Sequence, residues 1–127
     1  MGLKFSVVTV VYNAEAAISK TMESVLAQTY KPYEYIIIDG KSTDNSLQII
    51  SQFKSKFEEK GIELKIISEK DTGIYNAMNK GIKYAAGDFI SFLNAGDWYE
   101  KDALQNINAL YQKESFDLTY GGLHYIN

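Results

Sequence analysis

Three apolar runs in this sequence each end in a short cluster of polar residues. They occupy residues 5–13, 35–44 and 89–97, and all three are rich in β-branched or aromatic side chains. A segment with helical periodicity follows each run, so the pattern predicts parallel strands of one sheet. In an open α/β sheet, ligands bind in the crevice outside the carboxyl ends of the strands. We therefore expect the polar clusters to lie at a binding site.

The alternation of strand and helix patterns continues along the whole chain. Strands are predicted at residues 5–13, 33–39, 62–68, 89–93 and 116–120. The alternation predicts an α/β fold, with an open, mostly parallel sheet flanked by helices on both faces and a single domain over residues 1–127. No closing helix follows the last predicted strand, so we interpret the chain as C-terminally truncated, a fragment of a longer protein.

The segments between the strands each carry an apolar stripe that predicts a helix. Asn13 is expected to cap the first helix, and one helix is expected between the polar residues 42–44 and Gly61. Residues 36–38 are three isoleucines, which predicts a central strand buried on both faces. The helix after Gly73 is expected to turn four residues toward the core: Ile74, Met78, Ile82 and Ala85.

Composition narrows the partners that the chain can bind. A net charge of −3 over 127 residues argues against a nucleic-acid binder. All 13 basic residues are lysine, so a bound phosphate must be met by lysine, backbone N–H groups or a metal. The absence of cysteine excludes disulfides and thiolate chemistry and fits a cytoplasmic protein. No apolar run approaches the length of a membrane span.

The first two strands end in residues suited to holding a nucleotide. Tyr12 offers a ring that can stack on a base or sugar, with core packing as the alternative. Asp39 precedes Gly40, and an acid at this place accepts hydrogen bonds from a ribose or base edge in nucleotide-binding α/β folds. A turn aspartate is the alternative. The nearby Lys41 and Asp44 favour the functional interpretation, because capping alone does not require a second acid.

A second polar segment, residues 69–81, leads into a predicted helix. Asp71 precedes this helix, whose N-terminus favours phosphate through its dipole and free N–H groups. Asn76, Asn79 and Lys80 lie on its polar face. A solvated face explains the lysine better than it explains two asparagines inside a helix.

A third polar segment, residues 94–97, follows the strand predicted at 89–93. Asn94 and Asp97 offer amide and carboxylate oxygens that can hold a hard divalent cation, with water and substrate phosphates as its other ligands. Capping of the next helix by Asp97 is the alternative.

Taken together and in this order, these segments resemble the nucleotide-sugar-binding half of a family 2 glycosyltransferase of the GT-A type. The resemblance implies that Thr9, Tyr12 and Glu15 line the base pocket and that Asp39 accepts a hydrogen bond from the base. Gly40 stands where many members of the family have a second aspartate.

The later segments extend the resemblance. Residues 68–81 are similar to a subgroup that builds bacterial surface polysaccharides, which implies that Asp71 and Asn79 lie near the nucleotide. Residues 92–98 match the family's metal-binding Asp-x-Asp segment, with Asn94 in the nucleotide-sugar site and Asp97 as the metal ligand. Asn94 and Gly96 occupy positions that are usually acidic, which leaves Asp97 as the only carboxylate of this segment.

The resemblance implies inverting transfer of a sugar from a nucleoside-diphosphate donor, a UDP-sugar above all, to a saccharide or lipid-linked hydroxyl. Mg²⁺ or Mn²⁺ would assist, helped by Lys41, Lys70 or Lys80. The family's general base is expected beyond residue 127, so this chain should bind the donor without turning it over. A cytoplasmic location is expected, either free or at the inner face of the membrane.

A non-catalytic nucleotide-sugar-binding domain is the main alternative. A response-regulator receiver needs paired acids after its first strand, where this chain has Tyr12 and Asn13. A Rossmann dehydrogenase needs Gly-x-Gly-x-x-Gly at the same place, and this sequence lacks it.

Overall fold

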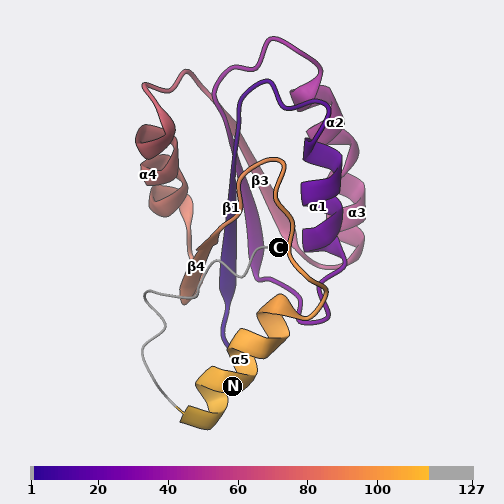
Figure 1. The fold of residues 1–127 in the computed structure, drawn as a ribbon, viewed down its shortest axis with the longest axis vertical. Helices are drawn as coiled ribbons and strands as arrows, with labels where there is room; N and C mark the ends of the chain where they lie inside the picture. The colour runs from indigo at the N-terminus through magenta and orange to yellow at the C-terminus, as the bar shows by residue number, and fades with distance from the viewer. Residues whose placement is uncertain (1, 115–127) are drawn as a thin grey trace.

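The computed structural model describes residues 2–114. Within them, four parallel strands form one sheet: β1 (Phe5–Val11), β2 (Glu34–Asp39), β3 (Glu63–Ser68) and β4 (Phe89–Phe92). Their order across the sheet is β3-β2-β1-β4, so β1 and β2 are central (Figure 1). The prediction of an α/β fold with a parallel sheet is confirmed. The strand predicted at residues 116–120 lies outside the described residues.

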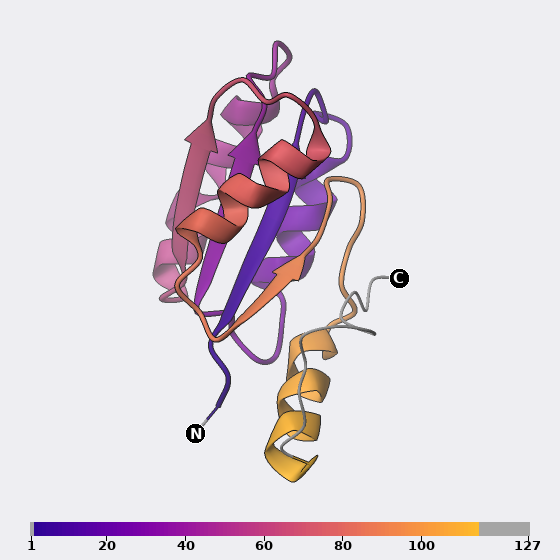
Figure 2. The same ribbon diagram turned by 90° about the vertical axis from the view of Figure 1, so that its left-hand side faces the viewer.

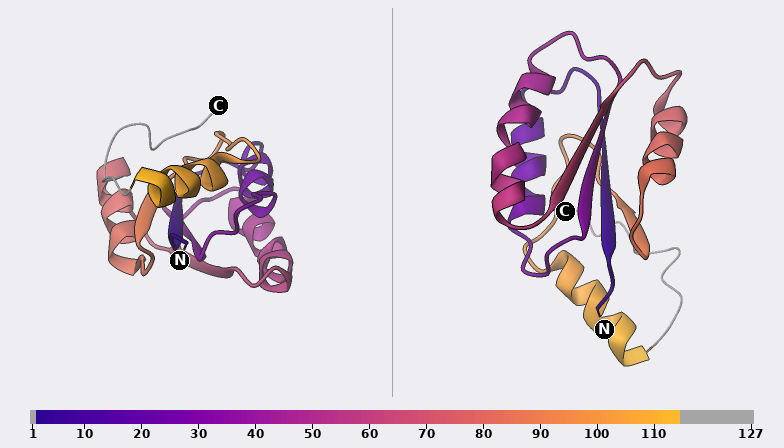
Figure 3. Two further views of the ribbon diagram at one scale, coloured as in Figure 1. Left: turned by 90° about the horizontal axis from the view of Figure 1, so that it is seen from below. Right: turned by 180° about the vertical axis from the view of Figure 1, so that it is seen from behind.

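Helices cover both faces of this sheet, as predicted. On one face lie α1 (Ile18–Leu26), α2 (Ser46–Gln52) and α3 (Lys54–Glu59), while α4 (Ile74–Tyr84) covers the opposite face (Figures 1 and 2). The last described helix, α5 (Ala103–Glu114), lies beyond the amino ends of the strands, near the chain's N-terminus (Figure 3). The carboxyl ends of the strands are therefore left to the connecting loops.

Side chains alternate between the two faces along the central strands. Val8 pairs with Ile36 in the register of β1 and β2, and both pack toward α4 in one cluster with Ile38 and Ala77. The odd-numbered neighbours, such as Ile37, pack toward α1–α3 in the larger cluster. Residues 36–38 are completely buried, which confirms the prediction of a strand buried on both faces.

Two predicted helix boundaries are wrong. The helix expected up to Gly61 is two helices, because the N–H of Phe53 bonds to the carbonyl of Ile50, one residue closer than in an α-helix. The rings of Phe53 and Phe57 both pack in the core. Asn13 does not cap α1. Ala17 occupies the N-cap position, and Asn13 bonds instead to the loop after β2.

The predicted inward face of α4 is wrong for its two isoleucines, whereas Met78 is half-buried and Ala85 packs against the core. Ala77 and Gly81 are its buried residues, whereas Ile74 and Ile82 are 49% and 48% exposed. The cause is a close approach of the helix to β1, since a Cβ added at Gly81 would lie 2.5 Å from Cγ1 of Val8. The smallest residues of the helix face the sheet, and the isoleucines are displaced toward its sides.

This close approach predicts an unusual response to Gly81→Ala. Alanine normally stabilises a helix relative to glycine. Here the added methyl group would push α4 away from β1, and we expect a loss of about 1–3 kcal/mol, as for other overpacked sites. Urea unfolding measures it. Asn79→Ala, at an exposed position of the same helix, is the control and should change stability by less than about 0.5 kcal/mol. Equal stability of wild type and Gly81→Ala would contradict this packing.

Candidate nucleotide-binding site

Asn13 joins the loop after β1 to the loop after β2. Its backbone is left-handed, with φ of 48°, and its side-chain oxygen accepts hydrogen bonds from the N–H groups of Thr43 (2.7 Å) and Asp44 (3.3 Å). The N–H of Asn13 donates in return to Oγ of Ser42 at 2.9 Å. The two loops therefore position each other at the carboxyl edge of the sheet.

A second set of hydrogen bonds continues this connection to the start of α2. Oγ of Ser46 accepts from the N–H of Ala14 at 2.8 Å, and Oδ2 of Asp44 accepts from the N–H of Glu15 at 3.1 Å. The carboxylate of Glu15 accepts from the N–H of Asn45 at 2.8 Å. Glu15 and Asp44 thus hold the loops together in this structure. The predicted contact of Glu15 with a nucleotide stays a prediction.

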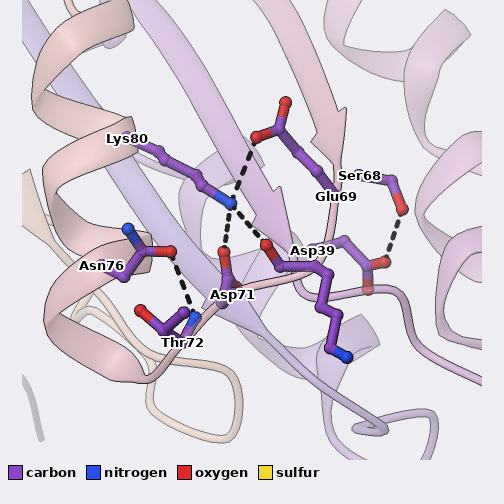
Figure 4. A network of polar contacts seen from close by, with 8 residues as sticks. Asp39, Ser68, Glu69, Asp71, Thr72, Asn76 and Lys80 are labelled. Carbon is purple, nitrogen blue, oxygen red and sulfur yellow. Dashed lines mark hydrogen bonds and ion pairs between the residues drawn. The ribbon is translucent and has the colours of Figure 1, made fainter.

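Asp39 lies at the expected end of β2, but its side chain points away from solvent. It is completely buried, and Oδ1 accepts from Oγ of Ser42 at 2.6 Å. Oδ2 accepts from the N–H of Ser42 at 3.0 Å and from Oγ of Ser68 at 2.9 Å; the bond to Ser68 is visible in Figure 4. The carboxylate therefore closes the turn after β2 and ties it to β3.

A cavity of about 520 Å³ opens on the α4 side of the same edge. This volume lies in the range of small-molecule sites. Its walls come from the end of β1, the turn after β2, the loop after β3 and the first turns of α4. Tyr12, 62% exposed, lies on one side and Ile74 on another, with Lys41, Lys70 and Asp71 around them. The cavity thus combines an aromatic ring, an apolar wall and charges of both signs.

Asp71 is held beside the cavity by Lys80, which reaches back from α4. The ammonium nitrogen lies 2.6 Å from Oδ1 of Asp71, 3.2 Å from Oε1 of Glu69 and 3.0 Å from the carbonyl of Lys70 (Figure 4). The hydrogen bond to Asp71, with a smaller contribution from Glu69, raises the pKa of Lys80. The lysine is therefore charged at neutral pH, and the loop before α4 is fixed by an ion pair.

The loop after β4 lies between the end of β1 and α1. The N–H of Leu93 donates to the carbonyl of Val8, and the N–H of Gly96 donates to Oγ1 of Thr21 at 2.8 Å. Asn94 is exposed and Asp97 is half-buried. Among residues 2–114 no group of three or more histidine, cysteine or acidic side chains could hold a metal. The two oxygen donors suit Mg²⁺ or Mn²⁺ only as part of a set completed by a ligand's own oxygens.

The structure divides the predicted site residues into two groups. Tyr12 and Asp71 line the cavity. Six others do not line it: Thr9, Glu15, Asp39, Asn79, Asn94 and Asp97. Thr9 is buried with its hydroxyl 2.7 Å from that of Tyr35, and Asn79 is on the exposed side of α4.

Several cavity residues were missed as site residues, and Ile74 is the most exposed apolar residue among them. Ile74 was expected in the core, yet its partly exposed side chain lines the cavity at the start of α4. An isoleucine directly after the polar residues 69–73 was the available signal, because a first-turn residue lies beside the loop that precedes it.

Comparison with known proteins gives the family. Residues 6–127 match the family described as "Glycosyl transferase family 2". The chain belongs to this family. Glycosyl transferase family 2 was also the resemblance drawn from the motifs, and that prediction is confirmed.

This family 2 chain is similar in sequence to glycosyltransferases from several organisms. It is 35% identical to a poly(ribitol-phosphate) beta-glucosyltransferase of Bacillus spizizenii, covering 98% of this chain and 20% of the relative. It is also 35% identical to a PGL/p-HBAD biosynthesis glycosyltransferase of Mycobacterium bovis, covering 92% of this chain and 45% of the relative. The chain thus spans less than half the length of these relatives.

Solved structures agree with the fold. TarS of S. aureus, residues 1–349, in complex with UDP-GlcNAc, is 28% identical and superposes with a TM-score of 0.79, covering 88% of this chain and 32% of TarS. Within the part of the family 2 chain that the structure describes, every helix is too short or too polar to cross a lipid bilayer.

The role of Asn13 is tested by two substitutions. Both Asn13→Gly and Asn13→Ala remove the acceptor for Thr43 and Asp44, which should cost about 1 kcal/mol. Only alanine must also adopt the left-handed backbone, which adds about 1–2 kcal/mol. Urea unfolding with unchanged m-values should therefore rank wild type above glycine and glycine above alanine. Two equally stable variants would show that the backbone conformation contributes nothing.

Proposed function

We propose that residues 1–127 form the donor-binding domain of a family 2 glycosyltransferase, and that the donor is a UDP-sugar. The observation that carries the proposal is the cavity at the carboxyl edge of the sheet, with an exposed tyrosine ring beside a charged loop. TarS, which shares the fold at 28% identity, was solved in complex with UDP-GlcNAc, and this supports the choice of nucleotide.

The cavity suits a nucleotide base. The ring of Tyr12 is exposed on one wall, and an aromatic face stacks on any planar base. Ile74 and Ala77 of α4 provide apolar surface on another wall. The carboxylate of Asp71 adds a hydrogen-bond acceptor for the edge of the base.

The diphosphate would be met by lysine ammonium groups. Lys41 and Lys70 line the cavity, and the sequence contains no arginine. Lysine binds phosphate as a point charge and imposes no bidentate geometry. We therefore assign these two lysines to the phosphates, in agreement with the helper role expected from the sequence.

Asn94 and Asp97 would hold Mg²⁺ or Mn²⁺ together with the diphosphate of the donor. Bound there, the ion would neutralise the charge that develops on the departing nucleoside diphosphate. Both donors are oxygens, as hard cations require, and the single carboxylate implies that affinity for the metal depends on the nucleotide.

The proposed reaction is inverting transfer. A hydroxyl oxygen of a saccharide or lipid-linked acceptor forms a bond to the anomeric carbon while the bond from that carbon to the diphosphate oxygen breaks. The hydroxyl proton goes to a general base, which we place in the remainder of a longer protein. The residues of this chain bind and orient the donor. A cytoplasmic location stays a prediction.

Thermal shift with a nucleotide panel tests donor binding. UDP-, GDP-, dTDP- and CDP-sugars are added with Mn²⁺, and the melting temperature should rise more with the UDP-sugars than with the CDP- or GDP-sugars, because a ligand that binds only the folded state stabilises it. No shift with any nucleotide would contradict the proposal. A non-catalytic binding domain would give the same shift, but the longer protein would then fail to transfer sugar to any acceptor.

Asp97→Asn tests the metal site. The amide keeps the shape but removes the charge, so the additional affinity for a UDP-sugar that Mn²⁺ confers should disappear while metal-free UDP binding persists. Calorimetry with and without Mn²⁺ measures both quantities. Glu100→Gln, an exposed acid in the same loop, is the matched control and should keep the metal effect. If wild type binds equally well without Mn²⁺, the metal assignment is wrong.

A further inference from the structure

Asp39 offers the cavity no free acceptor. Its carboxylate is completely buried, and both oxygens accept hydrogen bonds from Ser42 and Ser68. The alternation of the strands explains this placement. Asp39 is on the same face of the sheet as Ile37, whereas Gly40 and Tyr12 fall on the opposite face, toward α4. An acid that contacts a base lying on Tyr12 must therefore come from another segment.

The side chain of Asp71 occupies the space next to Gly40 and Tyr12. Oδ2 of Asp71 lies 2.9 Å from the position that a Cβ on Gly40 would take, and the ring of Tyr12 lies 3.6 Å from the same point. The side chain of Asp71, 12% exposed, thus fills the volume into which a side chain at position 40 would project. Lys80 engages Oδ1, and no hydrogen bond from the described residues reaches Oδ2.

We propose that Asp71 reads the nucleotide base through Oδ2 and that Gly40 is a glycine because Asp71 needs its space. This inference rests on the proposed function and assigns the acceptor within it. A carboxylate at the edge of a stacked base accepts from a ring N–H, which uracil and thymine present between two carbonyl groups. Cytosine presents an unprotonated ring nitrogen there, which a carboxylate repels.

Because Oδ1 of Asp71 already contacts Lys80, the choice of nucleotide base is narrowed further. Guanine offers a ring N–H and an amino group side by side, and it pairs best with a carboxylate that has both oxygens free. Lys80 engages Oδ1 of Asp71, so a single donor fits better. The site therefore favours a uridine or thymidine diphosphate sugar over its cytidine and guanosine counterparts.

The steric relation between Gly40 and Asp71 makes the inference testable by exchange. Gly40 has no left-handed backbone conformation, so the backbone accepts a side chain at this position once Asp71 is shortened. In the double variant Gly40→Asp/Asp71→Ala, the carboxylate comes from position 40 in place of position 71. Either substitution alone removes the acceptor or crowds two carboxylates together.

Calorimetry with UDP and CDP, free of sugar and metal, measures the effect on all four proteins. Asp71→Ala should weaken UDP binding by about 10- to 100-fold, the usual cost of a lost hydrogen bond to a charged group, and should change CDP binding little. Gly40→Asp alone should also bind UDP more weakly than wild type. The double variant should regain UDP affinity to within about 5-fold of wild type.

A variant of nearly unchanged shape provides an independent measurement. Asp71→Asn replaces an acceptor by an amide that can donate to the ring nitrogen of cytosine, so the UDP-to-CDP preference should fall by about 10-fold or more. Glu69→Gln is the matched control, since Glu69 also contacts Lys80 but is 54% exposed and does not line the cavity. Its UDP-to-CDP preference should equal that of wild type.

The outcomes separate the two proposals. If wild type binds UDP and both Asp71 variants keep its affinity and base preference, the role of Asp71 is wrong while donor binding stands. If the melting temperature shows that the double variant folds, yet it binds UDP as weakly as Asp71→Ala, the proposal that a carboxylate at position 40 can replace Asp71 is also wrong. If wild type binds no nucleotide, the proposed function itself fails and this inference fails with it.

Discussion

The pairing register between β1 and β2 is the constraint on which the rest of the carboxyl edge depends. Val11 lies opposite Asp39, and the N–H of Gly40 donates to the carbonyl of Val11 at 2.9 Å, so the pairing continues past the end of the strand. A shift of one residue would exchange the faces of every side chain. This register directs Tyr12 and Gly40 toward α4 and buries Asp39 on the other side.

Much of the fold could be predicted from the sequence, because the parallel strands and their helices are specified by local periodicity. The orientation of α4 could not. Its apolar positions form a plausible stripe through Ile74 and Ile82, but the contact between Gly81 and Val8 decides which face meets the sheet. A glycine contributes nothing to a hydrophobic pattern, so periodicity alone assigns it no preference for the core.

The candidate nucleotide-binding site could be predicted from the sequence only in part. Tyr12 and Asp71 were identified from strand ends and loops, and both line the cavity. The position of Asp39 was also available from the alternation along β2, since Ile37 and Asp39 must share a face. The hydrogen bonds of Asn13 and Glu15 were not available, because they join loops whose mutual distance only the folded sheet determines.

Lys41, like Asn13, has a left-handed backbone, with φ of 65°. For a lysine this conformation costs about 1–2 kcal/mol, which a glycine would recover. The glycine would also remove an ammonium group from the cavity wall. Thermal stability therefore favours glycine at position 41, whereas binding of an anion favours lysine. A variant library sorted only by thermal tolerance should replace this lysine, and its survivors should hold phosphate less well.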